Sequence, residues 1–365
     1  MCNIFINYYI FTKPMKIEQE SIIQNEGLDT KERKNCIICL REGIFVYRNL
    51  RDTLFDAPGF WNIRYCKKCD LHWIDPVVKE HDLWKIYRGY YTHKMPQLNM
   101  ETKSIRSLIK NGILATSLGY KELVSNNIEI AFGKLMSCIG PIKEIAVSSY
   151  RWLKSSQKGK LLDIGCGNGK FLYQMKRLGW EVYGVESDSG AVEIARRILG
   201  SNVFCGNLQD AGFPDNYFDA ITVSHVIEHV LDPLALLEEC RRILKPKGIL
   251  VIITPNSHSL CKRIFGENWR SWEVPRHIFI FSPKSLKMLV EKSGLRISGI
   301  QTSSESARWM WVAGRLLKKR GTLPGGIAQN TNPLIKIEGA IFWIVEYLIS
   351  RIKNVGEELV LFVTK

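Results

Sequence analysis

From residue 160 onward, short apolar runs alternate with segments whose apolar positions recur at helical spacing. The strand-like runs are Leu161–Ile164, Val182–Val185, Asn202–Cys205, Phe218–Val223 and Ile249–Thr254. The helical segments are Lys170–Leu178, Ser189–Leu199, Pro233–Leu244 and Pro283–Ser293. This alternation is typical of a parallel sheet covered by helices. It predicts an α/β fold built on a doubly wound, mostly parallel sheet.

The apolar pattern changes along the chain and predicts five parts. We expect a loose leader over 1–30, a cysteine-containing module over 31–95, a helical linker over 96–158, the α/β domain over 159–301, and a tail over 302–365. The linker helices are expected to break at Gly112, Gly119 and the Gly140-Pro141 pair. Two late runs predict further strands: Arg296–Gln301, and Leu359–Thr364 as an antiparallel strand at an edge of the sheet.

Composition narrows the class of protein. The 365 residues are 45% hydrophobic and 24% charged, which excludes a wholly disordered chain. No uncharged apolar run reaches the ~18 residues of an ordinary membrane span. The formal net charge is +15, but the basic residues are spread along the chain. That charge indicates either a lysine-rich solvated surface or a surface for nucleic acid or an anionic membrane. Without a secretory signal or a disulfide pattern among the 10 cysteines, we expect a cytoplasmic protein.

A glycine-rich loop follows the first strand of the α/β domain. Gly165, Cys166, Gly167 and Gly169 have the spacing GxGxG, which lets the backbone approach a ligand closely. Asp163 precedes the loop, where a carboxylate repels pyrophosphate but suits a ligand that carries an ammonium group. Glu186 ends the second strand, where a carboxylate can accept from both ribose hydroxyls. These features point to a nucleoside amino acid, with an NAD-binding fold or a purely structural turn as the alternatives.

The sequence LLDIGCGNG, followed by Glu186 and by FPDNYFD at 213–219, resembles the class I S-adenosylmethionine-dependent methyltransferases over about residues 158–300. The resemblance implies a Rossmann-like fold and S-adenosylmethionine as the cofactor. The loop would hold the methionine part of the cofactor, and Glu186 would hold the ribose. Further cofactor contacts are implied for four residues: Ser187, Asn207, Leu208 and Ser224.

Several ionisable residues follow the fourth strand, where parallel sheets bind their ligands. On one helical turn, His225, Glu228 and His229 would share a face. The series HVIEHV, TPN, PRH and FS resembles bacterial methyltransferases related to the ubiquinone-pathway and sugar enzymes. A hydroxyl acceptor must lose its proton, so we expect His229 as general base, or His277 as the second choice. The alternative is that these residues orient the substrate or pack against the cofactor.

A catalytic metal is a rival interpretation of the same residues. The small-RNA 2′-O-methyltransferases bind magnesium through a Glu-x-x-Glu-His motif and a distant histidine. Glu228, His229 and His277 match that set, but His225 replaces its first glutamate. Imidazoles with one carboxylate suit Zn, Fe or Mn better than Mg.

Three residues between the TPN and FS motifs are candidates for contacting the acceptor. Arg276 can pair with a phosphate or carboxylate, and Trp269 and Trp272 can stack on a ring or sugar. The alternative is a packed lid cluster. We expect O-methylation of a small-molecule, glycan-precursor or lipid-linked acceptor. Methylation of RNA and a non-catalytic cofactor-binding scaffold are the competing hypotheses.

The N-terminal module contains two CxxC pairs, Cys36/Cys39 and Cys66/Cys69, separated by 26 residues. Each pair places two thiolates on a tight knuckle, and two knuckles make a closed tetrahedral zinc site. The glycine that often follows each knuckle is replaced here by Leu40 and Asp70. The alternatives are a lost metal or a redox pair. The module resembles the zinc-ribbon leader that precedes this methyltransferase group, and we assign it a structural role.

The tail joins two segments of mixed character. Residues 308–320 combine Trp and Leu with terminal bases, and 335–352 are strongly apolar with four charged residues. Such segments either form a helical cap over the active site or a dimer face, or lie on a membrane surface. The second option predicts peripheral membrane contact through 305–352, at the inner face of the membrane.

Overall fold

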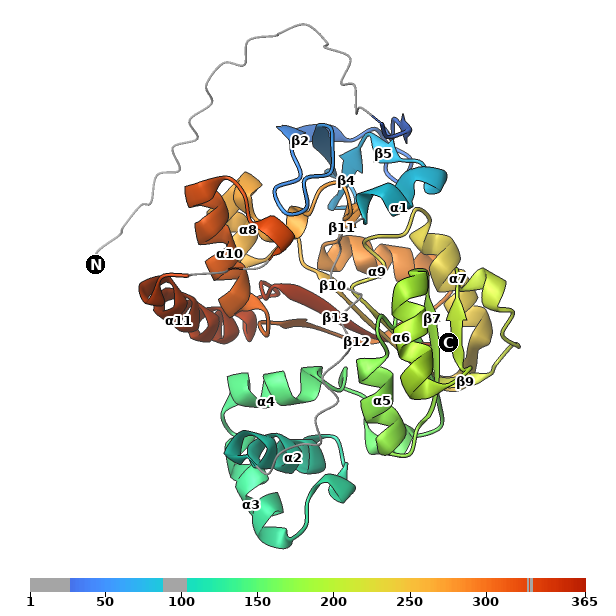
Figure 1. Cartoon of the computed structure of the whole chain (residues 1–365), viewed down its shortest axis with the longest axis vertical. Coiled ribbons are helices and arrows are strands. Elements are labelled where there is room, and N and C mark those ends of the chain that lie inside the picture. Colours follow the sequence, from blue (N-terminus) through green and yellow to red (C-terminus); the bar gives the residue numbers. More distant parts are fainter. Residues whose placement is uncertain (1–26, 88–103, 327, 329–330) are drawn as a thin grey trace, which may run out of the picture.

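The computed structural model describes residues 27–87, 104–326, 328 and 331–365. Most of the predicted leader, together with residues 88–103 around the predicted boundary between module and linker, lies outside them. Figure 1 shows the N-terminal strands in blue above the α/β domain, the linker helices in green below it, and the last helices in orange and red beside it.

Within the described residues, seven strands form one sheet in the order β12-β13-β10-β9-β6-β7-β8. Neighbouring strands from β10 to β8 are parallel, as predicted. The strands are β6 Lys160–Ile164, β7 Glu181–Glu186, β8 Val203–Cys205, β9 Phe218–Ser224, β10 Leu244–Pro255, β12 Arg296–Ser303 and β13 Glu358–Thr364.

The last strand, β13, is antiparallel to both of its neighbours, β10 and β12. Its direction agrees with the prediction, but its position does not, because β12 lies outside it and forms the edge. The burial of β13 explains this position: Leu359, Val360 and Leu361 are fully buried, which an edge strand rarely achieves.

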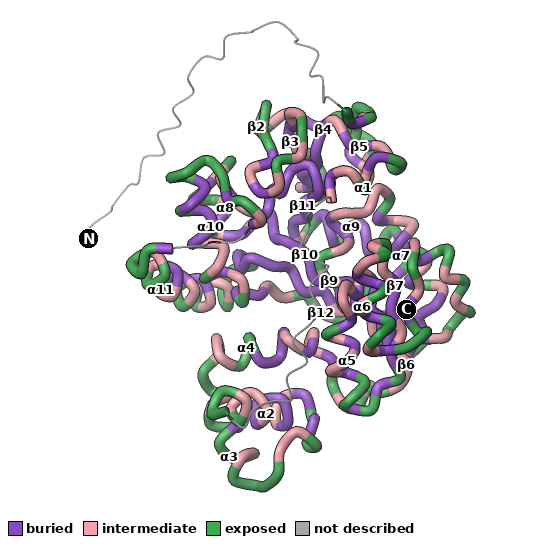
Figure 2. The backbone as a smooth tube through the Cα atoms, viewed as in Figure 1, coloured by how far each residue is buried: buried purple, intermediate pink, exposed green. Residues whose placement is uncertain are grey.

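Helices cover both faces of the sheet (Figure 1). They are α5 Lys170–Arg177, α6 Ser189–Leu199, α7 Pro233–Ile243, α8 Leu260–Phe265 and α9 Pro283–Lys292. The buried apolar residues of α5 and α6 join one core cluster, and those of α7 and α9 join another. Figure 2 shows the buried backbone concentrated along the central strands. Their continuous apolar runs follow from this cover on both faces.

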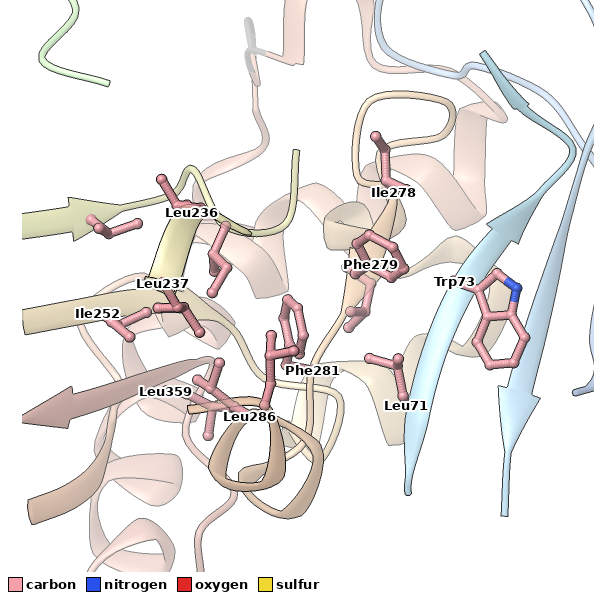
Figure 3. Close-up of a cluster of buried hydrophobic side chains, with 14 of the residues drawn as sticks. Leu71, Trp73, Leu236, Leu237, Ile252, Ile278, Phe279, Phe281, Leu286 and Leu359 are labelled. Carbon is pink, nitrogen blue, oxygen red and sulfur yellow. The ribbon is translucent and has the colours of Figure 1, made fainter. Parts of the chain in front are cut away.

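The N-terminal module is continuous with the α/β domain. Its elements are β1 Thr30–Lys31, β2 Ile44–Leu50, β3 Trp61–Cys66, β4 Leu71–Asp75, β5 Val77–Val78 and α1 Leu83–Ile86. A strand of the α/β domain, β11 Phe279–Ile280, pairs with β4 and extends the module's sheet to the order β11-β4-β3-β2. Figure 3 shows Leu71 and Trp73 of the module beside Phe279, in one buried cluster with Leu237 and Leu359.

The linker forms three α-helices within its described residues: α2 Ile105–Ser117, α3 Asn127–Met136 and α4 Gly140–Ser148. The expected break at Gly112 is wrong. Helix α2 continues through it because Gly112 lies against α3, where an added Cβ would be 2.8 Å from the Cα of Gly133. Gly112 therefore serves a close helix contact and not a turn. Gly140 and Pro141 begin α4, since proline suits a first helical turn.

The tail contributes two helices between β12 and β13: α10 Ala307–Arg320 and α11 Pro333–Ser350. Buried residues of α10 pack on Leu54 of the N-terminal module. Helix α11 exposes an apolar stripe with helical spacing: Leu334, Ile337, Ile341, Ile344, Val345 and Leu348. None of the helices in the described part of the chain is both long and apolar enough to cross a membrane.

Candidate functional site

The glycine loop joins the end of β6 to the start of α5. Gly165, Gly167 and Gly169 have φ values of +70°, +53° and +78°, which only glycine adopts without strain. A Cβ on Gly165 would collide with Val226 at 2.3 Å, whereas a Cβ on Gly167 would meet nothing within 4 Å. The loop is therefore packed tightly on one side and open at Gly167, where a ligand can approach the backbone. Cys166 is buried beneath it.

Asp163 lies fully buried at the end of β6. Its Oδ1 accepts hydrogen bonds from Thr222 Oγ1 at 2.8 Å and from the guanidinium of Arg151. Burial raises the pKa of the Asp163 carboxyl, and the positive charge of Arg151 opposes that shift. Its Oδ2 is buried without a hydrogen-bond partner among the described residues. An oxygen without a partner can accept a hydrogen bond from an ammonium group.

Glu186 ends β7 beside the glycine loop. Its Oε2 accepts from the backbone N–H of Gly167 at 2.9 Å, and its Oε1 accepts from the N–H of Asp188 at 3.0 Å. The carboxylate is thus fixed between the loop and the start of α6, where a ribose would meet it. Asn207 and Leu208 follow β8; Asn207 is exposed and Leu208 is buried. The exposed Ser187 hydroxyl donates to Glu186.

A cavity of about 360 Å³ lies beside the first turn of α5, which follows this loop. Its lining comes from the end of α4 and the segment after it, from the first turn of α5, from the ends of β9 and β10, and from the tail. The lining residues are Ser148, Ser149, Arg151, Trp152, Phe171, Ser224, His225, Ile253, Glu305, Ser306 and Glu358. Burial raises the pKa of Glu305 to about 6, and the neighbouring Glu358 adds to that shift. The cavity therefore combines aromatic walls with acidic, basic and hydroxyl groups.

His225 is the one predicted catalytic histidine among the residues that line this cavity. It does not lie on a helical turn: its φ is +54°, and residues 227–229 form a turn. Its Nδ1 lies 3.3 Å from Glu228, and its Nε2 lies 3.6 Å from Glu358. Burial lowers the pKa of His225, but these two carboxylates outweigh it and raise the pKa well above its usual range.

Glu228 is fully buried, and its Oε2 accepts from Thr254 Oγ1 at 2.9 Å. Burial alone would raise the pKa of Glu228, but the nearby histidines, His225 first, lower it to about 2. Its backbone carbonyl accepts from the N–H groups of Ile278 and Phe279. Glu228 thereby connects the turn after β9 to strand β11 and the N-terminal module.

His229 and His277 lie together behind the cavity, with ring centroids 4.6 Å apart. The Nδ1 of His229 is 3.0 Å from the carbonyl of Arg276, and that of His277 is 2.7 Å from the carbonyl of Ser271. Because a carbonyl only accepts, His277 donates from Nδ1 to Ser271, whereas the Nδ1 of His229 also lies 3.0 Å from the Tyr87 hydroxyl. Burial lowers the pKa of His277 to about 4. Glu228, His229 and His277 each bring one ligand atom within 4.8 Å of the others.

The three predicted acceptor contacts point into the protein. Arg276 is 0% exposed and pairs with Asp52 of the N-terminal module at 2.7 Å. Trp269 donates to Glu357 at 3.1 Å, and Trp272 donates to the carbonyl of Gly266 at 2.9 Å. These contacts account for all three side chains as packing and anchoring groups. Their positions therefore do not support the prediction that they contact an acceptor.

The four cysteines of the module come together, with one sulfur from each within 4.8 Å of the others. Cys36, Cys66 and Cys69 are buried and Cys39 is half-buried. Leu40 and Asp70, which follow the two knuckles, both have a φ of +60°. That left-handed conformation explains why glycine is usual at these positions. The arrangement can hold one tetrahedral metal ion.

Sequence reasoning missed several residues that line the cavity. Arg151 lies in the linker, and Glu305 and Glu358 lie on either side of the helical tail. No motif marks them, because the fold brings them to the glycine loop from distant parts of the chain. A φ of +50° at Arg151 and +55° at Trp152 turns the linker toward the site, and the sequence shows no glycine there that would signal the turn.

Comparisons with known proteins identify relatives of this chain. A family model described as a methyltransferase domain matches residues 145–298. The chain is 35% identical over 150 residues to the ubiquinone biosynthesis O-methyltransferase of Cereibacter sphaeroides, a match that covers 37% of this chain and 60% of that protein. It is 34% identical to the protein of the same name from Dinoroseobacter shibae, over 42% of this chain and 67% of that protein.

Two further proteins are similar to parts of this chain. The demethylmenaquinone methyltransferase of Thermotoga maritima is 35% identical, over 31% of this chain and 52% of that protein. A solved structure of a SAM-dependent methyltransferase from Archaeoglobus fulgidus has a TM-score of 0.38 and 23% identity, covering 57% of this chain and 86% of that one. The chain spans about 60% of the length of the Cereibacter relative.

Proposed function

Because the chain belongs to the class I S-adenosylmethionine-dependent methyltransferases, we propose that it methylates a hydroxyl oxygen of a small-molecule, glycan-precursor or lipid-linked acceptor. The observation that carries the proposal is the cavity lined by Phe171, which follows the glycine loop, and by Ser224 and His225 at the end of β9. The relatives whose names specify a quinone pathway support a small-molecule acceptor. When bound, S-adenosylmethionine supplies a methyl group on a sulfonium, which is already a good leaving group.

The residues around the loop fit this cofactor. Asp163 offers an unpartnered oxygen for its ammonium group, Arg151 offers a guanidinium for its carboxylate, and Glu186 offers acceptors for its ribose. The remaining work of the chain is to orient the acceptor, to exclude water and to remove one proton. Trp152 and Phe171 wall the cavity with aromatic surface.

We assign the role of general base to His225, in place of His229, which the sequence had led us to expect. His225 lines the cavity, whereas His229 lies with Tyr87 and His277, and neither His229 nor His277 is among the lining residues. Against the effect of burial, Glu228 and Glu358 raise the pKa of His225, so the ring must lose its own proton before it acts as the base, and turnover should increase as pH rises through that pKa. His229 and His277 then act as supports of the site, or as ligands of a metal ion.

The metal interpretation of Glu228, His229 and His277 rests on the closeness of their ligand atoms. It predicts that the purified full chain carries a metal ion that His277→Asn removes. Equal metal content in the wild type and this variant would contradict it. At the N-terminus, the four-cysteine cluster supports a structural zinc ion, which would hold the knuckles against β11.

The exposed stripe of α11 supports contact with an anionic membrane surface. It presents apolar side chains at i, i+3, i+4 and i+7, and exposed basic residues at 336, 351 and 353 accompany it. We expect the protein to co-sediment with vesicles containing anionic lipid at low salt, and Ile341→Lys to weaken this. A matched exposed control, Ile128→Lys on α3, should leave it unchanged. Wild-type protein that stays in the supernatant would contradict the proposal.

Methyl transfer itself is tested with S-adenosylmethionine carrying a labelled methyl group. Purified protein and the cofactor are incubated with cell extract, which is then separated into polar metabolites, lipids and RNA. We expect label in the polar or lipid fraction, lost with His225→Asn. Label in RNA would overturn the acceptor class, and activity retained in His225→Asn but lost in His229→Asn would overturn the choice of base. Cofactor binding without any labelled fraction would favour the scaffold hypothesis.

A further inference from the structure

Three ligand-type side chains meet inside the protein, and none of them lines the cavity or belongs to the cysteine module. Cys261 lies on α8, Glu346 lies on α11, and Glu357 directly precedes β13. Their exposed fractions are 0%, 0% and 1%. One sulfur or carboxylate oxygen from each lies within 4.8 Å of the other two. The three elements are far apart in the sequence, so the fold itself assembles this cluster.

Glu346 is the unusual member of the cluster. Both of its carboxylate oxygens are buried and have no hydrogen-bond partner among the described residues. Glu357, in contrast, accepts from the N–H of Cys261 at 3.2 Å and from Trp269 Nε1 at 3.1 Å. A buried carboxylate without a partner is strongly unfavourable, and a second carboxylate beside it increases the repulsion. A positive charge at this position would remove both penalties.

The nearby side chains do not supply that charge. No ion pair joins Glu346 or Glu357 to a lysine, arginine or histidine in the part of the chain that the structure describes. The hydrogen bonds to Glu357 come from neutral groups, among them the backbone N–H of Cys261 and the indole of Trp269. Two acids therefore face a thiol in the buried interior, where protons on the carboxyl groups or a metal ion would balance their charge.

We infer that Cys261, Glu346 and Glu357 bind one zinc ion. Zinc accepts one thiolate and carboxylate oxygens together, because it is intermediate between hard and soft metals. On binding, the proton of the thiol and the proton shared by the two acids would pass to solvent, and three anionic ligands would then hold the doubly charged ion with one net negative charge. The spread of the ligand atoms allows them to close on one ion with small side-chain movements.

A zinc ion bound by these three residues would link the tail to the sheet. Helix α8 follows β10, α11 belongs to the tail, and Glu357 lies immediately before Glu358, which lines the cavity. An ion at this position would fix the start of β13 and hold α11 against the domain. This inference does not depend on the proposed reaction, because metal content is measured without cofactor or acceptor.

Metal content of the full chain, purified with zinc and without chelator, tests the inference. Elemental analysis should find about one zinc ion fewer per chain in Glu346→Gln than in the wild type. Glu338→Gln is the matched control, since Glu338 is on the same helix but pairs with Arg315 on the surface. It should keep the wild-type content. Equal zinc in the wild type and Glu346→Gln would overturn the inference and favour a proton shared by the two acids.

A second measurement needs no variant. Crystals of the wild-type protein grown with zinc, measured at the zinc absorption edge, should show an anomalous peak between Cys261, Glu346 and Glu357. The four-cysteine cluster provides an internal reference in the same map. A map with no peak among these three residues would overturn the inference, whether or not Glu346→Gln folds.

Discussion

The buried ion pair between Asp52 and Arg276 offers a sharp test of how the N-terminal module supports the site. Both side chains are 0% exposed, and Arg276 Nη2 lies 2.7 Å from Asp52 Oδ1. Asp52→Asn keeps the shape but removes the charge. Arg276 would retain the carbonyl of Ile86 at 3.0 Å and Glu273 at 3.4 Å. Removing one partner of a buried pair typically costs about 3–5 kcal/mol, and the remaining partners place our expectation near the lower end, about 3 kcal/mol.

Urea unfolding of the full chain, followed by circular dichroism, measures this change. The control is Glu32→Gln, which removes the exposed ion pair between Glu32 and Lys34, whose side chains are 71% and 57% exposed. Exposed pairs contribute about 0–1 kcal/mol, so the control should lie close to the wild type. A loss below about 1 kcal/mol for Asp52→Asn would refute the view that this pair anchors the module.

Three further predictions follow from individual residues. Glu186→Gln should weaken binding of S-adenosylmethionine about 10- to 100-fold in calorimetry, because a charged acceptor for the ribose is lost; unchanged affinity would contradict its role. Leu40→Gly should raise stability to urea by about 0.5–1 kcal/mol, since Leu40 is 73% exposed yet left-handed with a φ of +60°; a loss of stability would contradict this. Burial, with Lys262 nearby, lowers the pKa of His72 from 6.5 to about 3, so the unfolded chain takes up a proton first as pH falls. From pH 7 to 5 the free energy of unfolding of the wild type should fall by about 2 kcal/mol more than that of His72→Gln, as measured by urea unfolding at both pH values.

The elements of the α/β domain were predictable because their signals are local. Apolar runs set β6 to β10, and Asp188 and Asp232 cap α6 and α7 through their first backbone N–H groups. The cofactor residues share this property, since Asp163, the glycines and Glu186 all lie at strand ends that the sequence marks.

The acceptor side was less predictable because distant contacts determine it. The backbone of His225 is left-handed, and its side chain therefore lies apart from that of His229. A helical turn would have kept the two side chains on one face. Tyr87 of the N-terminal module, 142 residues away in the chain, then contacts His229. Arg276 looked available for an acceptor because its partner, Asp52, is 224 residues away. A single sequence shows no signal for such pairings.

The most direct test of the account is a crystal structure of the protein with S-adenosylhomocysteine, the product form of the cofactor. We predict that its ribose hydroxyls contact Glu186, that its amino-acid end lies at Asp163 and Arg151, and that its sulfur faces the cavity beside Ser224 and His225. A product molecule bound elsewhere, or one whose sulfur faces away from this cavity, would contradict the proposed site.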